Sequence, residues 1–282
     1  MAKILFDISV LQEPADDKQG HLVMEVGLRS FSYAAVDAGG NLLHLRVYEM
    51  DALSVADWCN EWNALFKADD WLKHGPEKKT VVYNLPESQM VPESFYEENA
   101  GRNMIELFHG DLNKGITLSE RIAGQSHYNV FRVPAALHNL LQTSFADSQY
   151  HHFYSLWLQQ NNKAGQQYAD YISAVFYPNR ILAGVVKNNQ LQLVQSFVYE
   201  AAEDAGYYLL NICSQLQLPP AETPLLLSGM IDVSSVLYTE IFKYFGQAAL
   251  EDFAVPATAA PALQDFPSHF FSPLLKLALC VS

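Results

Sequence analysis

The sequence predicts an α/β protein of two similar lobes, each with a mixed β-sheet flanked by helices. Two observations support this fold class. The chain has 282 residues, of which 50% are hydrophobic, and this length suits two cores of about 100–150 residues each better than one. The same order of elements (three strands, a helix and a fourth strand) also occurs twice along the chain, and an internal repeat determines the whole architecture.

The first lobe is predicted to begin with three short strands, at residues 22–27, 31–36 and 42–48. The segment Asp37–Asn41 between the last two is a strong hairpin signal. Apolar residues recur at helical spacing over residues 54–73, where Ser54 can cap the start and Pro76 follows the end. Residues 80–85 then predict a buried strand.

The second lobe is predicted to repeat this order, with strands at residues 171–177, 181–187 and 191–199. A helix over residues 201–217 ends before two prolines, and residues 224–228 form a short buried strand. A further helix is predicted over about 233–245. The C-terminal segment 269–281 is apolar on one face and is predicted to be a helix that closes this lobe.

A shift of 151 positions relates the two halves, because it places Val47-Tyr48-Glu49 on Val198-Tyr199-Glu200. The polar stretch 159–167 is suited to a linker or a helix end. We therefore predict a first lobe over residues 1–164, with an inserted segment at about 96–127, and a second lobe over residues 165–282.

Three antiparallel strands, a crossover helix and a fourth strand make up the ribonuclease H-like unit. With two such lobes the chain resembles the actin-like ATPase superfamily of actin, sugar kinases and DnaK-type chaperones. It is similar to the pilus-assembly protein PilM and the GspL cytoplasmic domain, and most similar to a bacterial family of unassigned function with that fold. The resemblance rests on the stretches LVMEVG at 22–27, MVPESFY at 90–96 and LLLSGM at 225–230.

In active members of that superfamily, an Asp on the first strand, followed by Gly and Thr or Ser, binds Mg²⁺ and phosphate. The matching positions here are Glu25, Gly27 and Ser30, with Leu28 where a hydroxyl would stand. Glu25 keeps a carboxylate suited to a hard cation, and Gly27 allows close backbone approach. The longer side chain displaces the charge, so an ordinary strand ending in a turn is the alternative.

The resemblance implies a second phosphate loop in the second lobe. The shift of 151 instead places Phe176 on Glu25 and Pro178 on Gly27, which removes both a ligand and a backbone donor. Arg180 lies just after this loop, and its guanidinium could bind phosphate.

An adenosine-type turn is predicted at Ser228-Gly229, between a strand and a helix. Active members usually have two glycines at this turn, and here there is one. A purely structural turn is the alternative.

Other polar pairs are weaker candidates. His151-His152 has Asp147 as its only acidic neighbour in the sequence and no cysteine nearby, so no metal site is predicted. Asp69-Asp70 falls at a predicted helix end or face, where solvated carboxylates are usual.

The formal net charge of −14 opposes nucleic-acid binding. The three cysteines are far apart, and no apolar run approaches the ~20 residues of a membrane span. These features predict a cytoplasmic protein with no membrane insertion.

The function is not specified by the sequence. We favour a non-catalytic relative of the actin-like ATPases that acts as a scaffold or regulatory binding protein with a protein partner. No cofactor is expected, and ATP with Mg²⁺ is disfavoured. One alternative is a weak ATPase or small-molecule kinase that uses Glu25 and Mg²⁺ in an interlobe cleft. Another is a binding module for a non-nucleotide ligand in that cleft.

Overall fold

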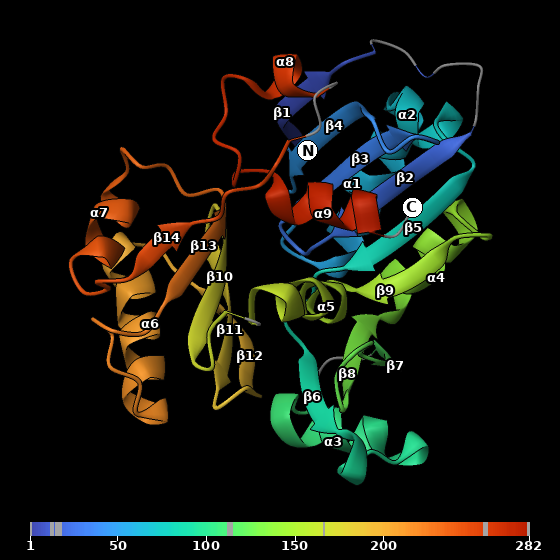
Figure 1. The fold of residues 1–282 in the computed structure, drawn as a ribbon. Coiled ribbons are helices and arrows are strands. Elements are labelled where there is room, and N and C mark those ends of the chain that lie inside the picture. The colour runs from blue at the N-terminus through green and yellow to red at the C-terminus, as the bar shows by residue number, and fades with distance from the viewer. Residues whose placement is uncertain are drawn as a thin grey trace. The chain divides into compact units, whose positions relative to one another are not determined.

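The computed structural model describes residues 2–11, 14, 19–111, 115–165, 167–255 and 259–280 (Figure 1). Two compact units make up the chain. The first contains Met1–Trp157, Pro256–Leu263 and Leu274–Ser282, and the second contains Leu158–Val255 and Gln264–Pro273. The predicted division at residues 164 and 165 falls at the end of helix α5 (Phe153–Gly165) and stays a prediction.

The first lobe is built on a sheet with the strand order β1-β4-β3-β2-β5-β9. Its strands are β1 (Lys3–Ser9), β2 (Gly20–Val26), β3 (Ser30–Asp37), β4 (Leu42–Glu49), β5 (Lys78–Tyr83) and β9 (Gln149–His152). The first four in the order pair antiparallel, whereas β5 and β9 run parallel to β2, so the sheet is mixed. The four strands predicted for this lobe are confirmed.

Strands β1 and β9 were not predicted. In β1, Asp7 interrupts the apolar pattern, but its carboxylate pairs with Arg46 at 2.8 Å and with His44 at 3.1 Å on the neighbouring β4. A polar residue with partners across the sheet is compatible with a strand, and those partners lie far away in sequence.

The helix predicted over residues 54–73 is two helices, α1 (Val55–Ala68) and α2 (Asp70–His74). Ser54 caps α1 as predicted, because its side chain accepts from the Asp57 amide. Asp69 ends α1 in an extended conformation, and its carboxylate accepts from the Trp71 and Leu72 amides at the start of α2. Helical spacing continues across the break because α2 resumes after one residue.

Helices α1, α2 and α4 (Ala135–Ser144) cover one face of this sheet. Trp58 and Trp62 of α1 are buried there against the even-numbered residues of β2. A separate antiparallel sheet, β6-β8-β7, follows with helix α3 (Gly101–His109). Its strands are β6 (Ser88–Pro92), β7 (Gly115–Arg121) and β8 (His127–Pro134), and most of the segment predicted as an insertion belongs to it.

The second lobe has the strand order β12-β11-β10-β13-β14. Its strands are β10 (Tyr171–Tyr177), β11 (Arg180–Lys187), β12 (Gln190–Val198), β13 (Leu225–Gly229) and β14 (Ala248–Leu250). This order repeats β4-β3-β2-β5-β9, and the directions match as well. Both lobes therefore contain the four predicted strands, and each has a further parallel strand, β9 or β14, that was not predicted.

The second-lobe helices agree with the predictions in position but are shorter. Helix α6 (Ala202–Leu216) packs on the sheet, and α7 (Val236–Phe242) begins after the Ser235 cap. Helix α8 (Ala260–Leu263) precedes α9 (Ser272–Cys280), which starts three residues later than the predicted C-terminal helix. Helix α8 and residues 274–280 of α9 belong to the first unit, so the prediction that the C-terminal helix closes the second lobe is wrong. Residue 281 of that prediction lies outside the described residues.

The predicted offset of 151 between the repeats is wrong. The residues that face the helices are Leu22, Met24 and Val26 in β2 and Ile172, Ala174 and Phe176 in β10. A one-residue slip moves every side chain to the opposite face, so these strands correspond with an offset of 150. Glu25 is therefore equivalent to Val175, and Gly27 to Tyr177, not to Phe176 and Pro178.

The match between Val47-Tyr48-Glu49 and Val198-Tyr199-Glu200 is a coincidence of residue types. Tyr48 pairs with Phe31 across the first sheet, and Ile181 occupies the equivalent place in the second. The partner of Ile181 is Phe197. The residue of the second lobe that is structurally equivalent to Tyr48 is therefore Phe197, two residues before Tyr199.

Candidate functional site

Glu25 lies near the end of β2, on the face opposite to α1. Only 4% of its surface is exposed, and its Oε1 accepts a hydrogen bond of 2.6 Å from Asn84 Nδ2. Asn84 directly follows β5, and its backbone amide donates to the Val26 carbonyl at 2.8 Å. The parallel pairing of β2 and β5 thus brings an amide side chain to a buried carboxylate, which needs such a donor.

Gly27 forms a tight turn with Ser30. The Gly27 amide donates to the Ser30 carbonyl at 2.8 Å, and the Gly27 carbonyl accepts from Trp58 Nε1 at 3.0 Å. A Cβ atom at Gly27 would lie 3.0 Å from Ser30 Oγ. Both backbone groups of Gly27 therefore have partners within the lobe, and the absence of a side chain keeps the turn tight.

Gly229 ends β13 in a left-handed conformation, with φ of +82°. A Cβ atom there would lie 2.3 Å from the Phe176 carbonyl oxygen on the neighbouring β10. The Gly229 amide donates to the His269 carbonyl at 2.9 Å, and the Met230 amide donates to the Phe176 carbonyl at 2.7 Å. Glycine is required by these close approaches, and the donors at the turn are already used.

Ser228 contributes little at this turn, because its Oγ lies 3.4 Å from the Ala174 carbonyl oxygen. At the neighbouring hairpin the Arg180 guanidinium carbon stands 4.7 Å from the centroid of the Tyr177 ring. The Tyr177 carbonyl accepts from the Tyr199 hydroxyl at 2.6 Å.

The six predicted site residues thus form two sets, each at one end of one sheet. Glu25, Gly27 and Ser30 belong to the first lobe, and Arg180, Ser228 and Gly229 belong to the second. Asn84 was missed as a site residue because the predicted strand 80–85 included it, whereas β5 ends at Tyr83. The signal in the sequence was that Asn84 is a polar residue directly after the buried apolar run of β5.

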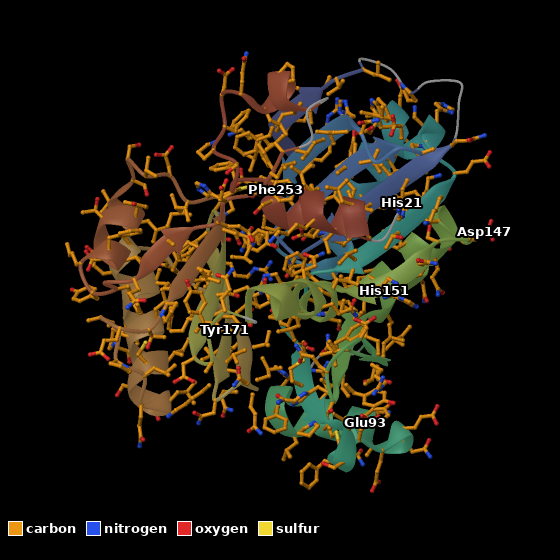
Figure 2. All side chains as sticks on the ribbon, in the orientation of Figure 1. His21, Glu93, Asp147, His151, Tyr171 and Phe253 are labelled. Carbon is orange, nitrogen blue, oxygen red and sulfur yellow. The ribbon has the colours of Figure 1, made fainter. Side chains whose placement is uncertain are left out.

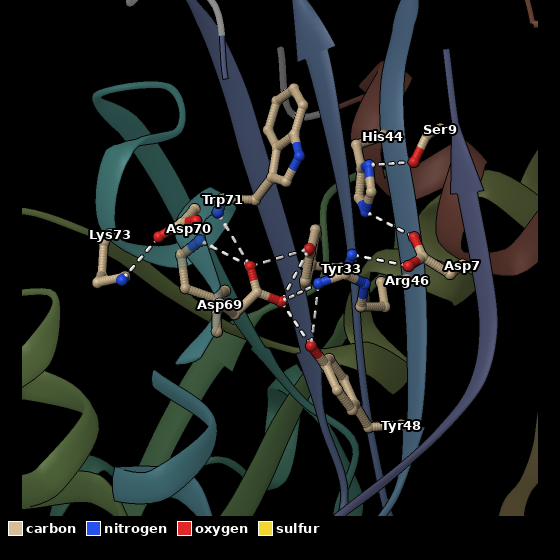
Figure 3. A network of polar contacts seen from close by, with 11 residues as sticks. Asp7, Ser9, Tyr33, His44, Arg46, Tyr48, Asp69, Asp70, Trp71 and Lys73 are labelled. Carbon is tan, nitrogen blue, oxygen red and sulfur yellow. Dashed lines mark hydrogen bonds and ion pairs between the residues drawn. The ribbon is translucent and has the colours of Figure 1, made fainter. Parts of the chain in front are cut away.

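The prediction that Asp69 is solvated is wrong (Figure 3). Asp69 is 3% exposed, and its carboxylate accepts from the Tyr33 hydroxyl at 3.0 Å and the Tyr48 hydroxyl at 2.5 Å. Arg46 forms an ion pair with it at 2.8 Å. Burial raises the pKa of both tyrosines, and the negative charge of Asp69 raises it further, so both hydroxyls stay protonated as donors. Asp70, by contrast, pairs with Lys73 at the surface, as expected.

A second polar group joins β7 to β9. Glu120 Oε2 lies 3.1 Å from His151 Nδ1, and Glu120 Oε1 accepts from the His152 amide at 2.8 Å. Burial alone would raise the pKa of Glu120, but these hydrogen bonds hold it below its usual value. The acid beside His151 is therefore Glu120, not Asp147 (both His151 and Asp147 are labelled in Figure 2). In the described part of the chain, no group of three or more His, Cys, Asp or Glu side chains could hold a metal ion.

The repeated strand order places this protein among those with the actin-like ATPase fold. A Bacteroides thetaiotaomicron protein with actin-like ATPase fold and unknown function matches 89% of this chain and 97% of its own, at 18% identity and a TM-score of 0.74. The chain itself belongs to DUF3822, a family of proteins of unknown function, whose sequence profile matches residues 12–247. No curated protein matches the sequence.

Two further solved structures share the fold. The PilM–PilN type IV pilus biogenesis complex contains a chain that matches 92% of this one over 98% of its own length, with 13% identity and a TM-score of 0.57. The ethanolamine utilization protein EutJ from Carboxydothermus hydrogenoformans matches 96% of this chain and 92% of its own, with 8% identity and a TM-score of 0.50. At such identities the likeness extends to the fold alone.

Proposed function

We propose that this chain is a non-catalytic protein of the actin-like fold that acts as a cytoplasmic scaffold or regulatory binding protein. The observation that carries the proposal is the hairpin between β10 and β11. The positions equivalent to Glu25 and Gly27 are Val175 and Tyr177, which offer no metal ligand and no glycine. An ATP site of this fold would need phosphate donors from both lobes, since the charge on the phosphates is neutralised jointly.

The contacts of the remaining candidate residues support the same proposal. Glu25 is buried and hydrogen-bonded to Asn84, so its carboxylate links β2 to the residue that follows β5. The amides of Gly229 and Met230 bond to carbonyls of the second lobe, so neither is offered to an anion.

A protein partner is proposed because another protein of this fold, PilM, has been solved in a complex with PilN. Cytoplasmic placement is proposed because Cys59 and Cys213 are free thiols, as is usual in a reducing compartment. No helix within the described ranges is long and apolar enough to cross a membrane.

Calorimetric titration with ATP and Mg²⁺ tests the proposal. The expected dissociation constant is above ~1 mM, which corresponds to a binding free energy weaker than about −4 kcal/mol. Loss of two or three charge-assisted phosphate contacts, each worth roughly 1.5–3 kcal/mol, would remove most of a micromolar affinity. Micromolar binding would overturn the proposal and favour the enzyme.

Glu25→Gln is the matched variant for this titration. A glutamine carbonyl can still accept from Asn84, whereas it is a poor Mg²⁺ ligand. We expect identical titrations of the variant and the natural protein. A Mg²⁺-dependent ATP signal that Glu25→Gln abolishes would support the weak ATPase or kinase instead.

A further inference from the structure

Strand β12 is the outermost strand of the second-lobe sheet and, among the described strands, pairs with β11 alone. Its nine residues, QLQLVQSFV, include no charged residue, no proline and no glycine. Val198 at its end is 64% exposed. An edge of this kind presents unpaired backbone donors and acceptors to any other strand that approaches it.

The other edge strands that the structure describes each carry a feature that opposes pairing. Strands β9 and β14 have four and three residues, and β6 has five and ends at Pro92. Strand β1 has Lys3, Asp7 and an irregular register, and β7 ends in Arg121. Charges, prolines, bulges and short length are the usual means of blocking an edge. Strand β12 has only a bulge, at Gln192, which leaves Leu193–Val198 regular.

The hydrogen-bonding direction of this regular segment follows from one contact. The Tyr199 amide donates to the Asn179 carbonyl at 3.0 Å, so these two residues form a hydrogen-bonded pair between the strands. Such pairs alternate along an antiparallel ladder. The backbone groups of Leu193, Gln195 and Phe197 are therefore directed at β11. The open edge receives the backbone groups of the alternate residues, which are Val194, Ser196 and Val198.

We propose that a second copy of this chain pairs with β12 in an antiparallel manner, about a two-fold axis at Ser196. The outward-directed segment is self-complementary, since the axis places Ser196 opposite Ser196 and Val194 opposite Val198. Pairs of β-branched residues stabilise a ladder, and like charges directly opposite one another destabilise it. The two five-stranded sheets become one continuous sheet, and the interface has the isologous form usual in homodimers.

Charge favours a second copy over a foreign peptide as the occupant. The chain carries a net charge of −14, so self-association is least opposed where the surface bears no charge, as along β12. A basic peptide would find no acidic residue on this strand to select it. The inference does not depend on the proposed loss of nucleotide binding.

Sedimentation of the full chain over a range of concentrations tests the proposal. We expect a reversible dimer of twice the 31.7 kDa monomer mass. Ser196→Lys and Ser196→Glu each place like charges opposite one another within an interface and should weaken dimerisation by about tenfold. An equimolar mixture of the two variants should restore the dimer, because opposite charges then meet at the axis.

Val198→Lys provides an independent variant on the same edge, and Val236→Lys on α7 is its control, since Val236 is 71% exposed and lies outside β12. Val198→Lys should weaken dimerisation and Val236→Lys should not. Circular dichroism establishes that each variant is folded. The proposal is overturned if the natural chain is monomeric throughout, if the Ser196 variants dimerise as well as it does, or if their mixture stays monomeric. A monomeric natural chain would leave a strand of a different protein as the remaining partner for β12.

Discussion

Replacing Asp69 with alanine is expected to destabilise the first lobe strongly, although the residue is far from every predicted site residue in sequence. The substitution removes the N-cap of α2 and the shared acceptor for Tyr33, Tyr48 and Arg46 (Figure 3). Both hydroxyls are buried, so each would be left without this partner in a site that water does not reach.

The magnitude follows from these contacts. Loss of an N-cap costs ~1 kcal/mol, and a buried donor left without its partner costs roughly 1–3 kcal/mol. Breaking a buried ion pair costs about 3–5 kcal/mol, but Arg46 keeps Asp7 as a partner at 2.8 Å, so the lower end applies. Contributions within one network are not additive. We expect the free energy of unfolding of the first lobe to fall by about 3–5 kcal/mol.

Urea unfolding followed by tryptophan fluorescence measures this loss, because all four tryptophans belong to the first lobe. Asp70→Ala is the matched control, since it removes a neighbouring carboxylate that forms a surface ion pair with Lys73, and its unfolding should match that of the natural protein. Asp69→Asn, which keeps a capping oxygen, should fall between the two. If Asp69→Ala unfolds at the same urea concentration as Asp70→Ala, the network does not stabilise the lobe.

Gly229→Ala should destabilise the second lobe by more than the ~1–2 kcal/mol of a left-handed residue, because the new Cβ would also meet the Phe176 carbonyl. Hydrogen exchange of β13 should reveal this loss of stability. Gly40→Ala is the control, because Gly40 has a similar φ of +78° but an added Cβ atom there has its nearest neighbour 3.5 Å away. Equal losses of stability in the two variants would contradict the steric argument. Burial lowers the pKa of His21 to about 4. Between pH 6.5 and 4 the unfolded chain therefore binds more protons than the folded chain, and the stability of the protein should fall as the pH falls through that window. Denaturation at several pH values should show a smaller fall for His21→Gln, and an unchanged fall would exclude His21 as a contributor.

Much of the fold could be predicted because it is encoded locally. The nearly continuous buried runs of β2 and β10, the hairpin at Asp37–Asn41 and the Ser54 cap are each properties of a few consecutive residues. Repetition of the same order then indicated two lobes. Local patterns do not show which face of a strand a side chain occupies. The best match of residue types therefore gave an offset of 151 between the repeats, whereas the buried faces of the strands require 150.

The candidate site could be predicted only as far as residue types along one strand allow. Glu25 and Gly229 were found because they match motif positions of the superfamily that the chain resembles, but the partner of Glu25 is Asn84, 59 residues away. The acid beside His151 is Glu120, 31 residues away, although Asp147 is much nearer in sequence.

The sequence by itself determined the class of fold, four strands of each lobe in their order along the chain, and the two-lobed repeat, because backbone periodicity and turn chemistry are short-range. The tertiary structure decided which polar residues are buried and what satisfies them. Asp69 and Asp70 show the difference: they are identical and adjacent, yet Asp69 receives three side chains and two backbone amides in the core while Asp70 faces solvent. A carboxylate is stable in the interior only where distant parts of the chain converge on it with donors, and that convergence is a property of packing rather than of local sequence.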